Sequence, residues 1–404
     1  MALTVLQNIG LDDAATSQQT GTVCEPTVAA AGTQIFVTGN WFASRSADGG
    51  IHWTLIDPFT ELPSAAGGFC CDQLVLRCRT QKLWIWILQY SQDNHTNVLR
   101  IAASATGAPG SWHWWDFSPG MLNPAWRKLW FDYPDLAESD GAIWLTSNVF
   151  DSKDAWKRAV VLKLSTATML AGGTLNYRWW STAAHGSLRF VQGARDTMYF
   201  GSQNGTSGLR VFEWKDSGSN VGYWDVTVTP WGTGPFSSKG PGGVEWLSRC
   251  DDRITGAWLA GGQLGFLWTS SRMPGRPHPF IRVARIDIAA RSLVDEPDLW
   301  SPDFSLAYPA AASNSKSRVG ITAFIGGGTR HPCHLVGVRD DSAGTWEIRI
   351  AKASTHGPSD GKWGDYLSIR RHGSRPSTWV ASGYTLQGGT ARKNIEPRVV
   401  HFRS

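Results

Sequence analysis

The sequence predicts an all-β protein built as a single seven-bladed β-propeller domain over residues 1–404. Two observations lead to this fold class. Gly (44 residues) and Pro (20 residues) interrupt the chain so often that few stretches of helical length remain. A unit of about 58 residues also recurs along the chain, and such a period is typical of a four-stranded propeller blade.

Each unit begins with a polar segment, continues through small apolar residues and a turn, and then enters an aromatic strand. The units begin near Pro26, Asp72, Pro134, Phe190, Asp252, Pro309 and Pro376. Because these residues begin the same repeat, we expect them at equivalent positions of successive antiparallel blades.

Segments rich in Ser, Gly and Trp follow each unit and are expected at the outer edges of the blades. They end at Trp53, Trp115, Trp180, Trp224, Trp300 and Trp363. The last unit supplies only three strands. We therefore expect residues near Val5 to Ile9 to pair with Val399 to Phe402, which closes the ring and removes an exposed sheet edge.

Composition excludes several classes of protein. Hydrophobic residues make up 42% of the chain and charged residues 18%, which is typical of a globular protein with a large core. The net charge is +5, but Lys and Arg are scattered among Asp and Glu, so no basic block indicates a nucleic-acid partner. The longest strongly apolar run, Leu83 to Leu88, is too short to span a bilayer. We expect a soluble monomer.

The N-terminal segment gives little information on the compartment. Asp12 and Asp13 lie where a signal peptide would need apolar residues. A secreted protein whose signal has been removed is favoured over a cytoplasmic one, and the localisation stays open.

One column of residues precedes the predicted innermost strands. Its members are Glu25, Cys71, Tyr133, Arg189, Asp251, Tyr308 and Arg375. Four of them precede proline, which favours extended backbone. Since the innermost strands of a propeller surround its axis, we expect the column to form one polar funnel. Its members differ from blade to blade, which indicates one axial site rather than a pocket repeated around the ring.

The residue types of this column suggest chemistry on a sugar. The candidate catalytic residues are Glu25, Tyr133, Asp251, Tyr308 and His372, and the candidate substrate-binding residues are Asp72, Asp135, Arg189 and Arg375. Carboxyl groups act as general acids or bases, and a tyrosine beside a carboxylate can act as nucleophile or proton donor. Planar guanidinium groups bind a sugar carboxylate. The alternative is that these groups only hydrogen-bond one another and water. Asp132 and His185 flank the same column.

The cysteines and histidines leave further alternatives. Cys70 and Cys71 are adjacent, either as a vicinal disulfide or as two buried thiols, and the thiols are preferred. Cys333 lies between His331 and His334, but no second ligand cluster accompanies them. No cofactor is expected, and a channel cation such as calcium is left open.

One motif resembles a known family. The segment Ser46-Ala47-Asp48-Gly49-Gly50-Ile51-His52-Trp53 is similar to the Asp-box, S-x-D-x-G-x-x-W, of sialidases and related propellers. The resemblance implies a blade-edge hairpin remote from any active site, and therefore bears on fold rather than chemistry.

The sequence as a whole predicts a carbohydrate-active enzyme that cleaves a glycosidic bond at an acidic sugar. Sialidase-like hydrolysis and polysaccharide-lyase elimination both stay open, and the expected partner is an acidic oligo- or polysaccharide. The alternatives are a non-catalytic, lectin-like propeller and a protein-interaction scaffold.

Overall fold

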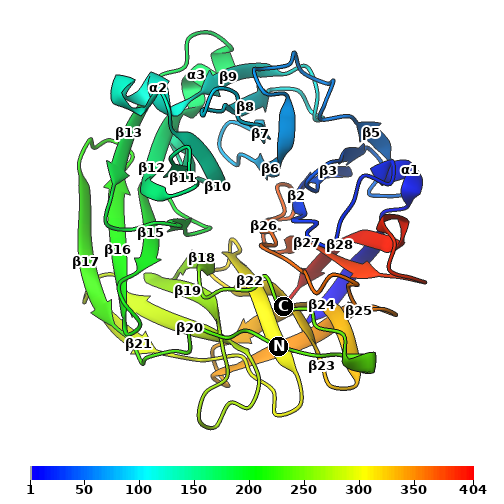
Figure 1. Cartoon of the computed structure of the whole chain (residues 1–404). Coiled ribbons are helices and arrows are strands. Elements are labelled where there is room, and N and C mark those ends of the chain that lie inside the picture. Colours follow the sequence, from blue (N-terminus) through cyan, green and yellow to red (C-terminus); the bar gives the residue numbers. More distant parts are fainter. Residues whose placement is uncertain (1) are drawn as a thin grey trace.

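Seven four-stranded antiparallel sheets form a ring in the computed structural model, which describes residues 2–404 (Figure 1). From the axis outward, the first three blades are β2 (Thr27–Ala31), β3 (Gln34–Thr38), β4 (Ala43–Ser46) and β5 (Thr54–Ile56); β6 (Phe69–Arg77), β7 (Trp84–Tyr90), β8 (Leu99–Ser104) and β9 (His113–Phe117); and β10 (Trp130–Glu138), β11 (Ala142–Phe150), β12 (Trp156–Ser165) and β13 (Tyr177–Thr182).

The remaining four blades are built in the same way, except that the outermost strand of the last blade is β1, from the N-terminal end of the chain. They are β14 (Arg189–Phe190), β15 (Thr197–Gln203), β16 (Gly208–Lys215) and β17 (Val221–Thr227); β18 (Ile254–Ala260), β19 (Gln263–Ser270), β20 (Phe280–Asp287) and β21 (Ser292–Asp295); β22 (Ser305–Ser313), β23 (Val319–Gly327), β24 (Arg330–Asp340) and β25 (Thr345–Ala353); and β26 (Ile369–Arg371), β27 (Trp379–Leu386), β28 (Ile395–Arg403) and β1 (Thr4–Gly10). The sequence-based fold class is confirmed.

Helices are short and lie in connections between strands. They are α1 (Asp13–Thr16), α2 (Pro119–Leu122) and α3 (Thr166–Ala171), with the 3₁₀ turns η1 (Pro124–Trp126), η2 (Pro241–Gly243) and η3 (Arg392–Asn394). Within the described chain, none of the helices has the length and apolar character needed to cross a membrane.

The innermost strands pack around the axis in sequence order. β2 contacts β6, β6 contacts β10, and the series continues through β14, β18 and β22 to β26, which contacts β2 again. Small residues allow this crowding: a Cβ placed on Gly256 of β18 would lie 3.1 Å from the Cα of Ala310 in β22. All seven strands start at the same end of the axis, called the mouth below, and finish at the far end.

Large aromatic side chains fill the space between blades. Trp144 of β11 and Trp214 of β16 are both fully buried, and their rings meet edge to face with centroids 5.3 Å apart. Burial of this apolar area is the main source of stability. Packing between blades therefore accounts for much of the chain's high content of Trp, 23 residues.

The closure of the ring agrees with the sequence prediction. β1 pairs with β28, with Val5 opposite Phe402 and Ile9 opposite Val399. The predicted blade starts at Pro26, Asp72, Pro134, Asp252 and Pro309 lie at the mouth, at or just before their innermost strands. Pro376 does not, because it lies between β26 and β27 at the far end. The real innermost strand of that blade, β26, has only three residues, and the repeat pattern matched the longer aromatic strand β27 instead.

The predicted blade edges are confirmed for four of six units. Trp115, Trp180 and Trp224 lie in outer strands and Trp53 directly precedes one, but Trp300 and Trp363 lie in connections beyond β21 and β25. The Ser46–Trp53 segment turns between β4 and β5 on the outer side of its blade. There the Asp48 carboxylate accepts hydrogen bonds from the backbone N–H of Ile51 and His52 at 3.0 and 2.9 Å.

Candidate functional site

Irregular backbone shapes the mouth. Glu25, Tyr133 and Tyr308 have φ angles of 49°, 57° and 56°, a left-handed region that side chains other than Gly rarely adopt. The expectation of ordinary extended backbone before proline is therefore wrong at these three positions. Tyr133 and Tyr308 lie where pairing with the next strand shifts register, that is, at β-bulges. Bulges of this kind redirect side chains and are frequent beside active sites.

Five carboxyl groups and two arginines gather at the mouth, and we call this group the acidic mouth. Its members are Glu25, Asp72, Asp132, Arg249, Asp251, Arg253 and Asp365. A cavity of about 540 Å³ lies over part of it and is lined by Glu25, Asp72, Asp132 and Arg249. Carboxyl groups outnumber guanidinium groups in the acidic mouth, while the solvent-exposed cations Lys362 and Arg392 also line the cavity.

Glu25 and Asp72 form a buried carboxyl pair on the floor of this cavity. The two residues are 3% and 9% exposed, and both line this cavity. Burial, together with the neighbouring carboxylates Asp132 and Asp365, raises the pKa of Asp72 to about 7. Burial and the same kind of repulsion, from Asp72 and Asp365, raise the pKa of Glu25 well above its usual range. Like charges this close cannot both ionise easily, so the pair retains a proton near neutral pH.

The two arginines of the acidic mouth are already paired. Arg249 donates two hydrogen bonds to Asp365, at 2.9 and 2.8 Å, and so joins the connection before β18 to the connection before β26. Arg253 lies 2.5 Å from Asp251, and its guanidinium covers the Tyr133 ring at 4.1 Å. Asp365 therefore occupies the Nε and Nη2 of Arg249, whereas Asp251 lies only at the Nε of Arg253.

Arg189 is likewise occupied. It donates to the Asp135 carboxylate at 2.9 Å and to the Tyr133 hydroxyl at 3.0 Å, and its side chain is 7% exposed. Asp135 also accepts from the backbone N–H of Phe190 at 2.9 Å. These contacts connect the third blade to the fourth beneath the mouth. The sequence correctly placed Asp135 and Arg189 near the funnel, but they bind each other.

The phenols of the mouth are deeply buried. Burial is the main reason that the pKa of Tyr133 is raised. Burial also raises the pKa of Tyr308, well above the usual range of a phenol. Tyr366 behaves in the same way, and its ring contacts Tyr133 with centroids 6.1 Å apart. All three groups therefore stay protonated, which favours a positioning role over that of a nucleophilic phenolate.

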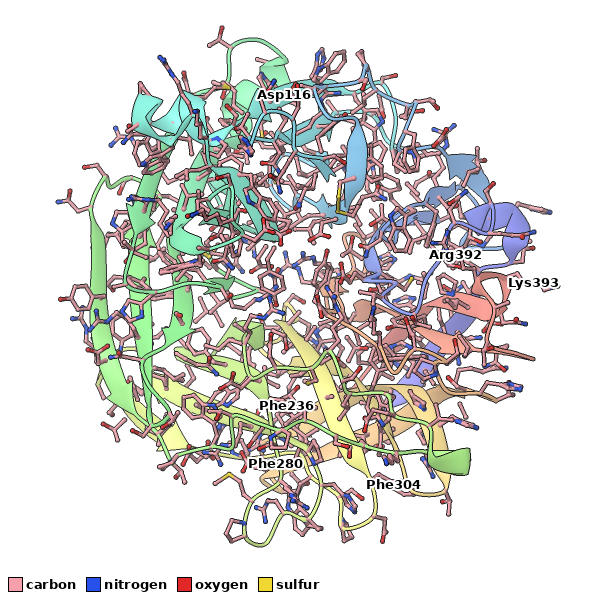
Figure 2. All side chains as sticks on the ribbon, in the orientation of Figure 1. Asp116, Phe236, Phe280, Phe304, Arg392 and Lys393 are labelled. Carbon is pink, nitrogen blue, oxygen red and sulfur yellow. A yellow bond between two sulfur atoms is a disulfide. The ribbon has the colours of Figure 1, made fainter. Side chains whose placement is uncertain are left out.

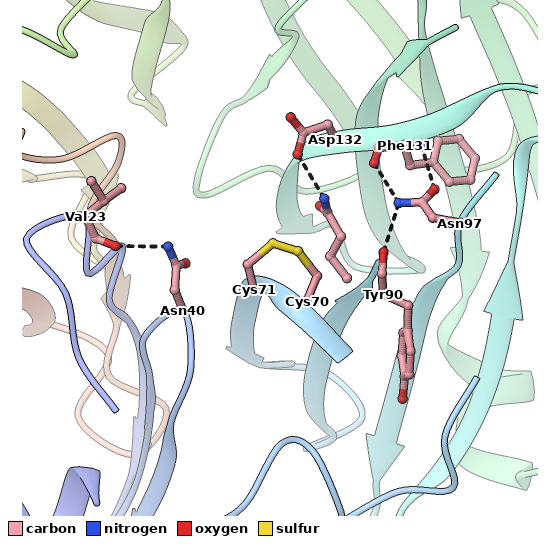
Figure 3. Close-up of a disulfide and its surroundings, with 9 residues drawn as sticks. Val23, Asn40, Cys70, Cys71, Tyr90, Asn97, Phe131 and Asp132 are labelled. Atoms are coloured by element: carbon pink, nitrogen blue, oxygen red, sulfur yellow. Dashed lines mark hydrogen bonds between the residues drawn. A yellow bond between two sulfur atoms is a disulfide. The ribbon is translucent and has the colours of Figure 1, made fainter. Parts of the chain in front are cut away.

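The remaining wall combines an aromatic ring with a disulfide. Trp41, from the turn between β3 and β4, lines the cavity, and the Arg392 guanidinium lies 5.7 Å from its ring centroid. Arg392 comes from the connection before β28 and is labelled in Figure 2. Cys70 and Cys71 form a vicinal disulfide at the start of β6, beside Asp132 (Figure 3). The preference for two free thiols was therefore wrong.

Comparison with known proteins gives a likeness in shape alone. No protein-family model matches the chain, and no curated protein matches it. Among solved structures, the GH93 α-L-arabinofuranosidase of Fusarium graminearum in complex with arabinobiose is similar, at 10% identity over 98% of this chain and 97% of that one, with a TM-score of 0.50. The α-L-arabinanase of Penicillium chrysogenum in complex with arabinobiose has a TM-score of 0.47 at 10% identity, covering 98% of each chain. This likeness shows the fold.

Two predicted site residues lie elsewhere. His372 and Arg375 follow β26, so they lie at the far end of the channel. His372 stacks on His401 with ring centroids 4.8 Å apart, and burial next to His401 and Arg375 lowers its pKa to about 4. Both assignments were wrong because the innermost strand of the last blade was misplaced. His185 lies before β14 and packs against the Phe212 ring.

The sequence analysis missed Arg249, Arg253 and Asp365. A signal for Asp365 was present, because Asp365-Tyr366 repeats the dipeptide Asp132-Tyr133 at the same position of another blade. Arg249 and Arg253 lie at the end of a long connection after β17, where no repeat indicates which residues reach the axis.

Metal ligands are not assembled in the part of the chain that the structure describes: no three His, Cys, Asp or Glu side chains are grouped to hold a metal ion. His334 is buried in β24 and hydrogen-bonds the Thr322 hydroxyl at 2.7 Å. His331 stacks instead on His356.

Proposed function

We propose that the chain is a glycoside hydrolase that cleaves a neutral oligosaccharide at the acidic mouth. The observation that carries this proposal is the buried Glu25–Asp72 pair in a cavity large enough for a sugar, where burial and neighbouring carboxylates raise the pKa of both groups. A carboxyl group that stays protonated near pH 7 is suited to protonate a leaving-group oxygen.

Asp132 supplies the second carboxylate. It lines the same cavity, it is half-buried, and its hydrogen-bond donor is the Gln89 amide, at 2.9 Å, rather than an arginine. Glycoside hydrolysis requires one protonated and one ionised carboxyl group on either side of the scissile bond. The pair gives its proton to the glycosidic oxygen. Asp132 either takes a proton from the attacking water or attacks the anomeric carbon itself, and the anomer of the first product distinguishes these routes.

The charge of the mouth favours a neutral sugar over the acidic sugar that the sequence suggested. An anionic sugar would face the carboxyl groups of Glu25, Asp72 and Asp132, while Arg189 and Arg249 are bound to aspartates. The other cations that line the cavity, Lys362 and Arg392, are exposed to solvent, where charges are screened. A lyase acting on a uronate would also need a positive group at the cavity floor beside the substrate carboxylate, but the arginine nearest to Glu25 and Asp72 in the cavity lining, Arg249, is bound to Asp365. For this reason we favour hydrolysis over elimination.

Trp41 gives the cavity an apolar wall on which a sugar ring can lie. Aromatic faces bury apolar surface while leaving polar groups at their edges free. Together with the carboxyl floor, this wall would orient a saccharide across the axis. Arabinobiose, which the Fusarium enzyme binds, is the first substrate to test.

The test is release of reducing sugar from a panel of neutral oligosaccharides, arabinobiose included, by the intact protein and by Asp72→Asn, Glu25→Gln and Asp132→Asn. We expect each substitution to lower kcat by at least about 100-fold, the usual contribution of a general acid or base. Asp225→Asn removes a carboxylate of the outer strand β17 that pairs with Arg210, and should leave kcat unchanged. Absence of turnover on every neutral sugar, with binding retained, would instead support the lectin-like alternative.

A further inference from the structure

The far end of the channel gathers arginines. Arg77 ends β6 and Arg370 and Arg371 lie in β26, so three guanidinium groups from two blades approach the axis where the innermost strands finish. They line a cavity of about 30 Å³ together with Arg79, Glu138, Gln192 and Ser313. Four arginines therefore face one carboxylate in this cavity.

Glu138, the one carboxylate that lines this cavity, does not neutralise the charge of all four arginines. Glu138 lies 3.5 Å from the Arg79 Nε and accepts the Arg79 backbone N–H at 2.7 Å. The Arg79 guanidinium also reaches Asp140 at 3.0 Å. The acidic groups of this end are thus largely engaged by Arg79, and Asp135, higher in the channel, is bound to Arg189.

Arg370 is the clearest unmatched charge. Arg370 is only 9% exposed. Within residues 2–404 its Nε has no hydrogen-bond acceptor. The buried Arg77 Nη1 also has no acceptor in the described chain, and the Arg77 guanidinium lies over the Trp84 ring at 4.8 Å. A buried charge without a partner is strongly destabilising, so this arrangement calls for a counter-charge.

Electrostatics agree with that geometry. The pKa of Arg370 is lowered to about 10, chiefly by burial; Asp135 and Glu138 act to raise it, and the neighbouring Arg189 acts to lower it. Burial also lowers the pKa of Arg371, as do Arg79 and Arg195. The cluster repels its own positive charge at neutral pH.

We propose that Arg77, Arg370 and Arg371 bind a small inorganic anion, which links the second and seventh blades across the far end of the channel. The size of the cavity decides the class of ligand. The cavity has room for about two water molecules, which admits a small ion and excludes a polymer or a sugar. Chloride and inorganic phosphate are the two candidate anions. A planar guanidinium group can donate two hydrogen bonds at once to the oxygens of phosphate.

An anion at this position would stabilise the closure of the ring. The seventh blade closes the ring, and its innermost strand β26 has only three residues, so few backbone hydrogen bonds hold it to β27. An anion held by two residues of β26 and by the end of β6 would fasten this strand to the rest of the ring.

The test is thermal unfolding of the whole protein at constant ionic strength, in a buffer whose only anion is a bulky sulfonate, with chloride or phosphate added in separate titrations. We expect a saturable rise in Tm of about 3–5 °C at a hundredfold excess over Kd in at least one titration. Arg370→Gln and Arg371→Gln should abolish the rise. In the sulfonate buffer Arg370→Gln should unfold at the same or a higher temperature than the native protein.

The matched control is Arg210→Gln, which removes an arginine of β16 whose charge is paired on the outside of the ring and should leave the rise intact. If Arg370→Gln does not fold, Arg371→Gln and the anomalous signal of bromide in soaked crystals, expected between the three guanidinium groups, decide the question. An equal Tm response in native and variant proteins, no saturable response to either anion, or bromide absent from this position when chloride gives the Tm rise would overturn the proposal.

Discussion

Replacing Asp72 by Asn should make the protein more stable at alkaline pH. The folded Asp72 has a pKa of about 7, against an ordinary value of 3.8. Between these pH values the folded state holds a proton that the unfolded chain has released. The free energy of unfolding therefore falls as pH rises from about 4 to about 7, and the lost stability persists above this range.

The size of the effect follows from the shift. About three pKa units at 1.36 kcal/mol each correspond to about 4 kcal/mol of unfolding free energy lost across this pH range. Asn has nearly the same shape as Asp but does not titrate. The Asp72→Asn variant should therefore keep most of the unfolding free energy that the native protein loses as pH rises. The variant and the native protein should be similar near pH 4 and differ by up to about 4 kcal/mol near pH 8.

Urea unfolding followed by tryptophan fluorescence at several pH values from 4 to 8 measures this difference. The same variant should lose hydrolysis, so stability and activity change in opposite directions, as expected where a catalytic group is kept at the cost of stability. Asp225→Asn, on the outer strand β17, is the control and should keep the native pH dependence. Identical pH dependence in Asp72→Asn and the native protein would refute the buried, shared proton.

Three further predictions test other parts of the account. Trp41→Ala should raise KM about tenfold with kcat nearly unchanged, since about 1.4 kcal/mol of binding corresponds to this factor; equal KM values would remove Trp41 from the sugar site. Tyr133→Phe deletes the acceptor of an Arg189 hydrogen bond and should lower the free energy of unfolding by about 1.5–3 kcal/mol while retaining measurable turnover, so loss of turnover in a stable variant would make Tyr133 catalytic. Deleting residues 2–10 removes β1 and exposes β28, and should lower Tm and promote association; an unchanged Tm would mean that β1 does not secure the ring.

The sequence predicted the ring well because repeated small and aromatic strands must bury their faces against one another. Pairing of the segment near Val5 to Ile9 with Val399 to Phe402 could be predicted by counting strands, since a missing fourth strand leaves an edge to be covered. The last blade was misassigned because a three-residue strand such as β26 carries too little pattern to distinguish it from a connection.

The site was predicted less well than the fold. Glu25, Asp72 and Asp251 were correctly placed at the mouth because they lie next to strands with a clear repeat. Which charges are free depends on contacts between blades, such as Arg189 with Asp135 and Arg249 with Asp365, and neither pairing follows from spacing along the chain. Without those pairings, the arginines suggested an acidic sugar.

The measurement that tests the central claim most directly is a crystal structure of Glu25→Gln with a neutral oligosaccharide. This substitution keeps the shape of the floor but removes the shared acid, so an intact sugar should remain bound. The account predicts one saccharide across the axis, with its glycosidic oxygen next to Asp72 and one ring over Trp41. Sugars bound in equivalent positions around several blades, or none at the acidic mouth, would contradict it.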